Sequence, residues 1–176
     1  DFLNRASKYE SVGDSERAEE YRYYASVEGK VFKDINECYK AYELKKVHLH
    51  NRIAIPGKAM KKSCLTDEMN DSYLITTVGK VIFNFAFPSD FPYINDDSSE
   101  NLIRTKESFF VKKGVNIPEY IQGLAINSPI TKKKITGIIN EIYHRYGTTK
   151  TSAVLDKIKD QGYKYSTTSG LTVALS

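Results

Sequence analysis

The sequence predicts an α+β fold, in which a small mixed sheet with helices is followed by a C-terminal helix pair. Residues 47–55 alternate apolar and polar side chains, which is the pattern of a half-buried strand. Residues 135–146 carry apolar side chains at helical spacing, which is typical of an amphipathic helix. Further helix and strand candidates follow one another in mixed order along the chain. We therefore expect one small sheet with helices packed against it.

The first third of the chain predicts a helix, a strand and a second helix. Asp14 or Ser15 can cap the first helix, and Gly29 is placed to end it. A short strand is expected at Lys30 to Phe32. The run from Asp34 to Glu37 resembles a capping box, so the second helix begins there. Its apolar face consists of Ile35, Cys38, Tyr39 and Tyr42.

The alternating strand at residues 47–55 is stopped by Pro56-Gly57, a pair that interrupts regular structure. One face of this strand carries Val47, Leu49, Ile53 and Ile55. The opposite face carries His48, His50, Arg52 and Ala54. We expect the first face to be buried and the second to remain open to solvent.

A second strand is predicted at Ser72 to Thr76, and the segment after it fits two structures. Helical spacing is shown by Val78, Val81, Ile82 and Phe85, whereas strand alternation is shown by Phe83, Phe85 and Phe87. We predict the helix, which Pro88 would end.

The segment from Pro88 to Glu107 is rich in Pro, Asp, Asn and Ser, which predicts a long exposed loop. A strand is expected after it at Phe109 to Lys112. Pro118 suits the first turn of a short helix that ends near Gly123.

The last third of the chain predicts the helix pair, from Thr131 to Gly162. Gly147 can end the first helix, and Thr148 or Thr149 can begin the second. The residues expected to be buried are Ile135, Ile138, Ile139, Ile142, Tyr143, Tyr146, Val154, Leu155 and Ile158. A strand is expected at Leu171 to Leu175. Natural chains seldom end inside an apolar strand, so we expect a longer parent chain.

Composition places the chain among soluble globular proteins, with 40% hydrophobic and 27% charged residues. No apolar run is long enough to span a membrane, and the first residues lack the pattern of a signal peptide. The net charge of +4 is too small to indicate nucleic-acid binding by itself. We interpret the lysine clusters as solvated surface; they are Lys61-Lys62, Lys112-Lys113 and Lys132-Lys133-Lys134. Cys38 and Cys64 form no CxxC pair and fit a reducing cytoplasm.

The search for catalytic motifs is negative, since no GxSxG elbow, P-loop, GxGxxG or HExxH occurs. His48 and His50 share a predicted strand face, as two metal ligands could, but zinc would need a third ligand. The acidic residues nearest to a metal cluster are Asp67, Glu68 and Asp71, which we interpret as solvated. We therefore predict no catalytic residue, no metal-binding residue and no cofactor in this chain.

Four segments, taken in order, carry a resemblance to a known family. They are Val47 to Ile53, Thr76 to Asn84, Asp90 to Asn95, and the run from Tyr146 to Thr167. Together they resemble the beta-prime subunit family of bacterial RNA polymerase, of the type found in low-GC Gram-positive bacteria or mollicutes. The chain departs from that family at Phe85 to Pro88, where Glu-Ile-Leu-Pro is usual. It also departs at Thr168, where a basic residue is usual.

The resemblance implies that the chain is an internal fragment of a larger multidomain subunit. Residues 1–130 would be part of its pore domain, and residues 1–29 a lineage-specific stretch. Residues 131–176 would begin the funnel, or secondary-channel, domain. The chain would line the secondary channel, through which nucleotides enter and backtracked RNA leaves. The loop that binds the catalytic Mg²⁺ would lie outside this chain, so the isolated chain is expected to be inactive.

The same resemblance implies a set of candidate channel-lining residues near the C-terminus. They are Lys164, Tyr165, Thr168, Ser169 and Gly170. The implied partners are the beta, alpha and omega core subunits and sigma. Through the parent enzyme they also include the DNA template, RNA and nucleoside triphosphates, all in the cytoplasm and without a membrane.

Two other hypotheses remain open at this point. The lysine clusters and the tyrosines could serve a freestanding RNA- or nucleotide-binding module, which salt-dependent binding would favour. The face formed by His48 and His50 could instead serve a metal-dependent enzyme, which metal in the purified protein would favour.

Overall fold

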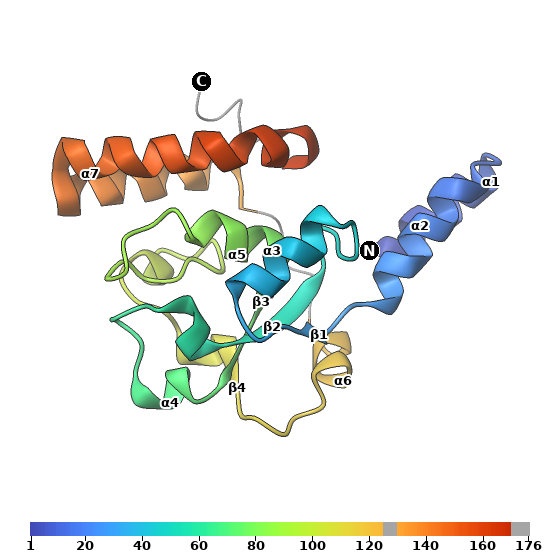
Figure 1. Ribbon diagram of the computed structural model, residues 1–176, viewed down its shortest axis with the longest axis horizontal. Helices are drawn as coiled ribbons and strands as arrows, with labels where there is room; N and C mark the ends of the chain where they lie inside the picture. The colour runs from blue at the N-terminus through green and yellow to red at the C-terminus, as the bar shows by residue number, and fades with distance from the viewer. Residues whose placement is uncertain (125–129, 170–176) are drawn as a thin grey trace.

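A four-stranded sheet lies at the centre of the computed structural model, which describes residues 1–124 and 130–169, with the side chains of residues 132 and 161–169 outside that description. The strands follow the order β1-β2-β3-β4. β1 (Lys30–Val31) runs parallel to β2 (Arg52–Pro56), whereas β3 (Tyr73–Thr77) is antiparallel to both β2 and β4 (Phe110–Val111). Helices surround this sheet (Figure 1), so the predicted α+β class with a small mixed sheet is confirmed.

The helices of the described residues begin at capping side chains, and the sequence predicts two of these caps, at Asp14 and Asp34. They are α1 (Phe2–Ser11), α2 (Ser15–Ser26), α3 (Ile35–Glu43), α4 (Asp67–Asn70), α5 (Val78–Asn84), α6 (Ile117–Gln122) and α7 (Lys132–Ser169). Short 3-10 turns lie at Gly57–Met60, Glu100–Leu102 and Glu107–Phe109. Asp14 and Asp34 each accept a hydrogen bond from the first turn of the helix that follows. The predicted helices at α2, α3, α5 and α6, and the strands at β1, β3 and β4, are confirmed.

The helix α1 was not predicted, because it buries only Phe2 and Ala6 and so shows little apolar periodicity. It packs against α2 through the stacked rings of Tyr9 and Tyr21, whose centroids are 5.5 Å apart. Gly13 joins the two helices with a positive φ of 81°, which glycine adopts without strain. The pair projects from one side of the sheet (Figure 1).

Helices cover both faces of the sheet. Ile53 and Ile55 are fully buried on one face, in a cluster that includes residues of α3 and α5. Ala54 is also fully buried, on the other face, where it packs in a cluster with Ile117 and Ile121 of α6. The expectation that the Ala54 face is open to solvent is therefore wrong, because α6 covers it.

The strand predicted at residues 47–55 is shorter than expected, since β2 begins only at Arg52. Residues 47–51 form a turn, although Val47 and Leu49 are buried as predicted. The turn exists because the Asn51 side chain accepts a hydrogen bond from the backbone N–H of His48, at 2.8 Å. A side chain that bonds its own neighbouring backbone competes with strand pairing.

The segment from Pro88 to Glu107 is irregular, as predicted, but it is not an exposed loop. Phe91, Tyr93 and Ile94 have exposed fractions of 0%, 0% and 2%. The side chains of Asn95 and Asn101 are buried with them. The expectation of an exposed segment is wrong because buried side-chain amides satisfy its backbone in place of solvent.

Two asparagine side chains make those hydrogen bonds, and a third bonds the segment to β3. Asn84 donates to the Ile94 carbonyl and accepts from the Ile94 N–H, at 2.8 and 2.7 Å. Asn101 donates to the Tyr93 carbonyl and accepts from the Asn95 N–H, at 2.8 and 2.7 Å. Asn95 donates to the Ile75 carbonyl of β3 at 2.9 Å. We call Asn84, Asn95 and Asn101 the amide network.

α7 consists of two helical segments that meet at Gly147, where φ is 83° and ψ is −174°. The predicted helix pair is therefore confirmed, although the second helix passes Gly162 and ends at Ser169. Ile142 from the first segment and Ile158 from the second share one buried cluster with Phe91. The strand predicted at Leu171 to Leu175 lies outside the described residues, and the division of the chain at residue 130 stays a prediction.

We expect Ile142→Ala to lower the free energy of unfolding by about 2–5 kcal/mol, because it opens a cavity between α7 and the core. Ile142 is fully buried, whereas Ile103 is 72% exposed and provides a matched control. Ile103→Ala should change the free energy of unfolding by less than about 0.5 kcal/mol. Urea denaturation of both variants measures the difference. Equal effects at the two positions would show that α7 does not pack as described.

Candidate functional site

The candidate channel-lining residues belong to the end of α7. Lys164, Tyr165, Thr168 and Ser169 lie on the helical backbone of its second segment, and their side chains fall outside the described part of the chain. Gly170 lies beyond the described residues altogether. These five residues therefore stay a prediction, and the site geometry comes from the rest of the chain.

The best defined polar site is the turn from His48 to Asn51. The backbone N–H of His50 donates to Nδ1 of His48 at 3.1 Å, and the N–H of Asn51 donates to the His48 carbonyl at 3.0 Å. The two imidazole rings lie 5.2 Å apart. The histidines predicted to share a strand face are thus neighbours, but they are brought together by a turn instead of a strand.

Asn51 and Glu28 connect this turn to α2, β2 and α6. The Asn51 side-chain amide donates to the Tyr24 carbonyl of α2 at 2.9 Å and to Oε1 of Glu28 at 2.7 Å. Glu28 also accepts from Nε of Arg52 at 2.8 Å, and Arg52 donates to the Ile121 carbonyl of α6 at 3.2 Å. Because these groups are at least half-buried, their hydrogen bonds fix how α2, β2 and α6 meet.

His48 lies in an aromatic environment. Its ring centroid is 5.4 Å from that of Phe2 and 5.3 Å from that of Tyr24. Burial, followed by the charges of His50 and Arg5, lowers the pKa of His48 to about 4. The ring is therefore neutral at pH 7, which agrees with Nδ1 acting as a hydrogen-bond acceptor.

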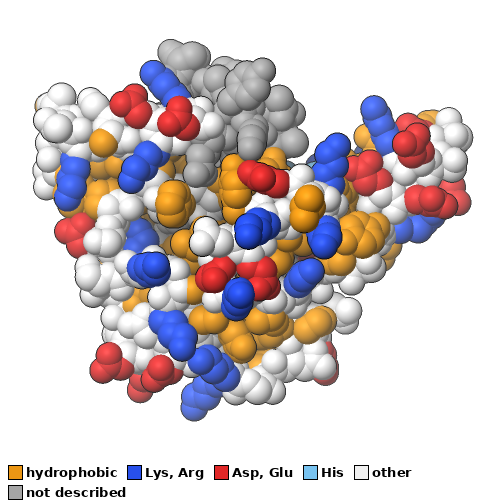
Figure 2. Space-filling view, viewed as in Figure 1, with side chains coloured by type: hydrophobic (Ala, Val, Ile, Leu, Met, Phe, Trp, Pro, Cys, Tyr) orange, Lys and Arg blue, Asp and Glu red, His pale blue; other side chains and the backbone are white. Residues whose placement is uncertain are grey.

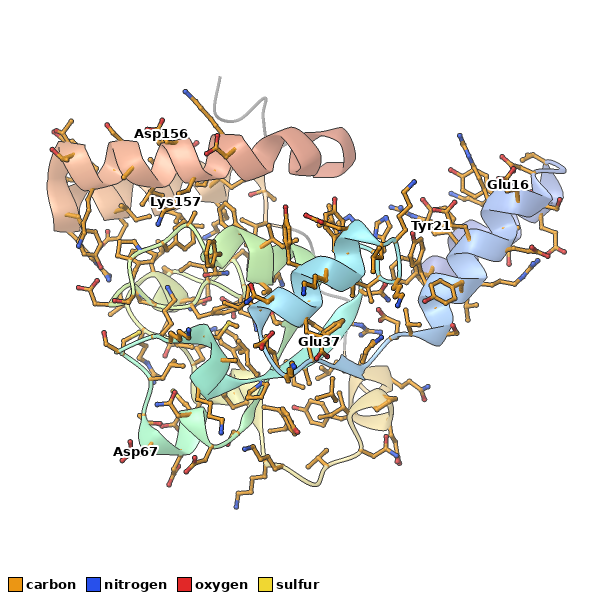
Figure 3. The ribbon with its side chains drawn as sticks, viewed as in Figure 1. Glu16, Tyr21, Glu37, Asp67, Asp156 and Lys157 are labelled. Carbon is orange, nitrogen blue, oxygen red and sulfur yellow. The ribbon has the colours of Figure 1, made fainter. Side chains whose placement is uncertain are left out.

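Metal-ligating side chains do not gather around these histidines. Among the residues that the structure describes, no group of three or more His, Cys, Asp or Glu residues could hold a metal ion. Asp67 and Glu68 are exposed on α4, as predicted. Figure 3 shows Asp67 and Glu37 on separate elements, and Asp156 on a third, without convergence.

Two lysines are buried that the sequence analysis missed. Lys62, interpreted above as solvated, is 8% exposed and its Nζ donates to the Pro88 carbonyl at 3.1 Å. Burial lowers the pKa of Lys62 to about 8. Lys80 is 6% exposed in α5. The remaining lysines and arginines on the face shown in Figure 2 are interspersed with carboxylates, without one dominant basic patch.

Lys80 stands directly beside the histidine turn. The backbone N–H of Val78 donates to the Asn51 carbonyl at 3.1 Å, and that of Gly79 donates to the Leu49 carbonyl at 2.9 Å. These bonds hold the first turn of α5 against the segment that carries His50. The sequence offered no signal for this contact, because it joins residues about thirty positions apart through backbone atoms alone.

No helix in the described residues combines the length and the apolar character that crossing a membrane requires.

Comparison with known proteins shows which proteins this chain is similar to. The family described as RNA polymerase Rpb1, domain 3, matches residues 21–176. The chain is 45% identical over 150 residues to the DNA-directed RNA polymerase subunit beta' of Geobacillus kaustophilus, and equally so to that of Bacillus thuringiensis strain Al Hakam. The subunit of Bacillus pumilus is 44% identical over 150 residues. Each alignment covers 85% of this chain and 12% of the relative, so the chain corresponds to a small part of those subunits.

The unfavourable protonation of His48 predicts a loss of stability in acid. Its folded-state pKa of about 4 lies below the ordinary value of 6.5. Stability from the neutral ring is therefore fully present above pH 6.5 and is lost as the pH falls toward 4. The pKa of His50 is also lowered, so it contributes with the same sign.

Urea denaturation at several pH values tests this prediction. His48→Phe, which keeps an aromatic ring, should flatten the pH dependence of the unfolding free energy between about pH 6.5 and 4. His144 is exposed, and His144→Phe should leave that dependence as it is in the parent chain. A parent chain that is equally stable at both ends of this range would contradict the described environment of His48.

Proposed function

This chain belongs to the family of RNA polymerase Rpb1, domain 3, and we propose that it works as a wall section of a bacterial RNA polymerase beta-prime subunit. The observation that carries the proposal is the identity of 45% over 150 residues to such subunits. The chain spans 12% of the length of that relative, so the activity proposed is that of a much longer parent.

We infer that this section lines the secondary channel of the parent enzyme. The resemblance described above implies that its matching segments belong to the pore domain and to the start of the funnel. The chain has a net charge of +4. A cationic wall raises the local concentration of anions, which suits a passage for nucleoside triphosphates. Lys164, Tyr165, Thr168, Ser169 and Gly170 are the residues proposed to face the channel.

The proposed role is structural, and the chemistry is assigned to other parts of the parent. The catalytic Mg²⁺ would be bound by an aspartate-rich loop outside this chain. The chain would support DNA-templated RNA synthesis in the cytoplasm together with the beta, alpha and omega subunits and sigma. The DNA template, the RNA transcript and the nucleoside triphosphates would bind the assembled enzyme. This section would form part of the channel wall and support the surrounding structure.

A chimeric subunit tests the assignment. Residues 21–176 would replace the matching segment of the Geobacillus kaustophilus beta' subunit, with Cys64→Ser to remove an exposed thiol. We expect the chimera to assemble with the other core subunits and to synthesise RNA, because the two segments share one fold. Lys164→Cys, labelled with a bulky maleimide, should slow nucleotide incorporation about tenfold or more by narrowing the proposed channel; a tenfold change corresponds to about 1.4 kcal/mol in the barrier.

Lys112→Cys provides the matched control, since Lys112 is exposed, directly follows β4 and is distant in sequence from Lys164. Its labelled form should incorporate nucleotides at the rate of the unlabelled chimera. Failure of a soluble chimera to assemble would refute the family-based assignment. Assembly without any effect of the label at position 164 would refute the channel placement alone.

A further inference from the structure

Lys80 is a buried cation without a partner at hydrogen-bonding distance. Its exposed fraction is 6%. Within the described residues no carboxylate or carbonyl oxygen accepts a hydrogen bond from its Nζ, whereas the comparably buried Lys62 donates to a carbonyl at 3.1 Å. A buried charge that is neither paired nor hydrogen-bonded is strongly unfavourable. The position therefore indicates a group that is not part of this chain.

Other basic side chains lie on the segments that surround the start of α5. Backbone hydrogen bonds from Val78 and Gly79 hold the start of α5 against the turn that carries His50. Phe2 of α1 packs on the neighbouring His48 at 5.4 Å, which brings Arg5, one helical turn later, to the same side. Arg5 stacks over the Tyr21 ring at 5.8 Å.

The electrostatic effects among these groups agree with this placement. Partial burial, then the charges of Arg5, the amino terminus and Lys80, lower the pKa of the surface residue His50. Burial lowers the pKa of Lys80, and the carboxylates of Asp96 and Asp97 oppose that shift. The two histidines and the cations thus disfavour one another's charged forms, which is the condition that an added anion would relieve.

The nearby acids do not fill the place of that anion. Asp96 forms an ion pair with Lys106 at 2.8 Å and accepts hydrogen bonds from Ser98, so its charge is already balanced by Lys106. Asp97 is exposed. Neither carboxylate reaches Lys80 within the distance of an ion pair in the described structure.

We propose that Lys80, His50 and Arg5 form a binding site for a phosphate-type oxyanion. Lys80 would supply a charge-assisted hydrogen bond from the buried side, and His50 and Arg5 would supply donors from the surface. A phosphate group suits this set, because its oxygens accept several hydrogen bonds and its negative charge would offset the positive charges of Lys80 and Arg5. The site does not depend on the proposed function, since an isolated chain can bind phosphate without the parent enzyme.

Inorganic phosphate, titrated into the 176-residue chain at constant ionic strength set with chloride, is the probe. The His50 ring resonances should shift with saturation, and the pKa of His50 should rise when phosphate is bound. Calorimetry should show that Lys80→Met weakens phosphate binding about tenfold or more, because one charge-assisted hydrogen bond is lost. Lys80→Arg keeps the charge and should keep the binding within about threefold, which is below 1 kcal/mol.

Lys157→Met is the matched control, because Lys157 is exposed on α7 and should leave phosphate binding unchanged. Lys80→Met changes a buried residue and can disturb folding. His50→Ala changes a surface residue, so it tests the site independently of folding, and it should also weaken binding. The proposal is overturned if the parent chain shows no phosphate-dependent shift of His50. It is equally overturned if His50→Ala, or a Lys80→Met chain that melts as the parent does, binds phosphate with the affinity of the parent chain.

Discussion

The hydrogen bonds of the amide network are the interaction on which the rest of this structure depends. Asn84 and Asn101 satisfy backbone groups of a segment that has almost no regular secondary structure, and Asn95 bonds that segment to the Ile75 carbonyl of β3. A buried N–H or carbonyl without a partner is unfavourable by about 1–3 kcal/mol, so the segment could not be buried without them. Once it is buried, its aromatic and aliphatic side chains become part of the core.

That buried segment is also the surface on which α7 rests. Phe91 and Ile94 share one cluster with Ile138 and Ile142 of the first helical segment and with Val154 of the second. Tyr146 of α7 donates a hydrogen bond to Asp90 at 2.8 Å, and Arg145 donates to the Leu102 carbonyl. The helix pair that carries the proposed channel residues is therefore positioned by the amide network, through a segment with the composition of a loop.

The sequence predicted those elements whose cause is local. Asp14, Asp34 and Thr77 cap helices by hydrogen bonds that span three residues, and the spacing of isoleucines around Ile138 specifies the face of a helix. The resemblance to a polymerase subunit, read from four short segments, was confirmed by a family match that covers residues 21–176.

Most errors of prediction have non-local causes, and the turn at Asn51 is the exception, because its hydrogen bond to the His48 N–H spans only three residues. The polar residues of segment 88–107 resemble those of an exposed loop, and only contacts with α5 and β3 bury them. Asn51 turns the chain at a place where apolar alternation predicts strand. The burial of Lys80 follows from backbone contacts between α5 and the histidine turn, which no local pattern encodes. The proposed channel residues rest on the family resemblance, without a local physical signal.

Amide hydrogen exchange of the chain in solution tests the central role of the amide network most directly. The N–H groups of Tyr93, Ile94 and Asn95 donate to the Thr105, Asn84 and Asn101 side chains at 2.9, 2.7 and 2.7 Å. We expect these three amides to be protected as strongly as those of Ile75 and Thr76 in β3, because both sets open only when the core opens. Exchange of the three amides at the rate of an exposed loop, while β3 remains protected, would contradict this account.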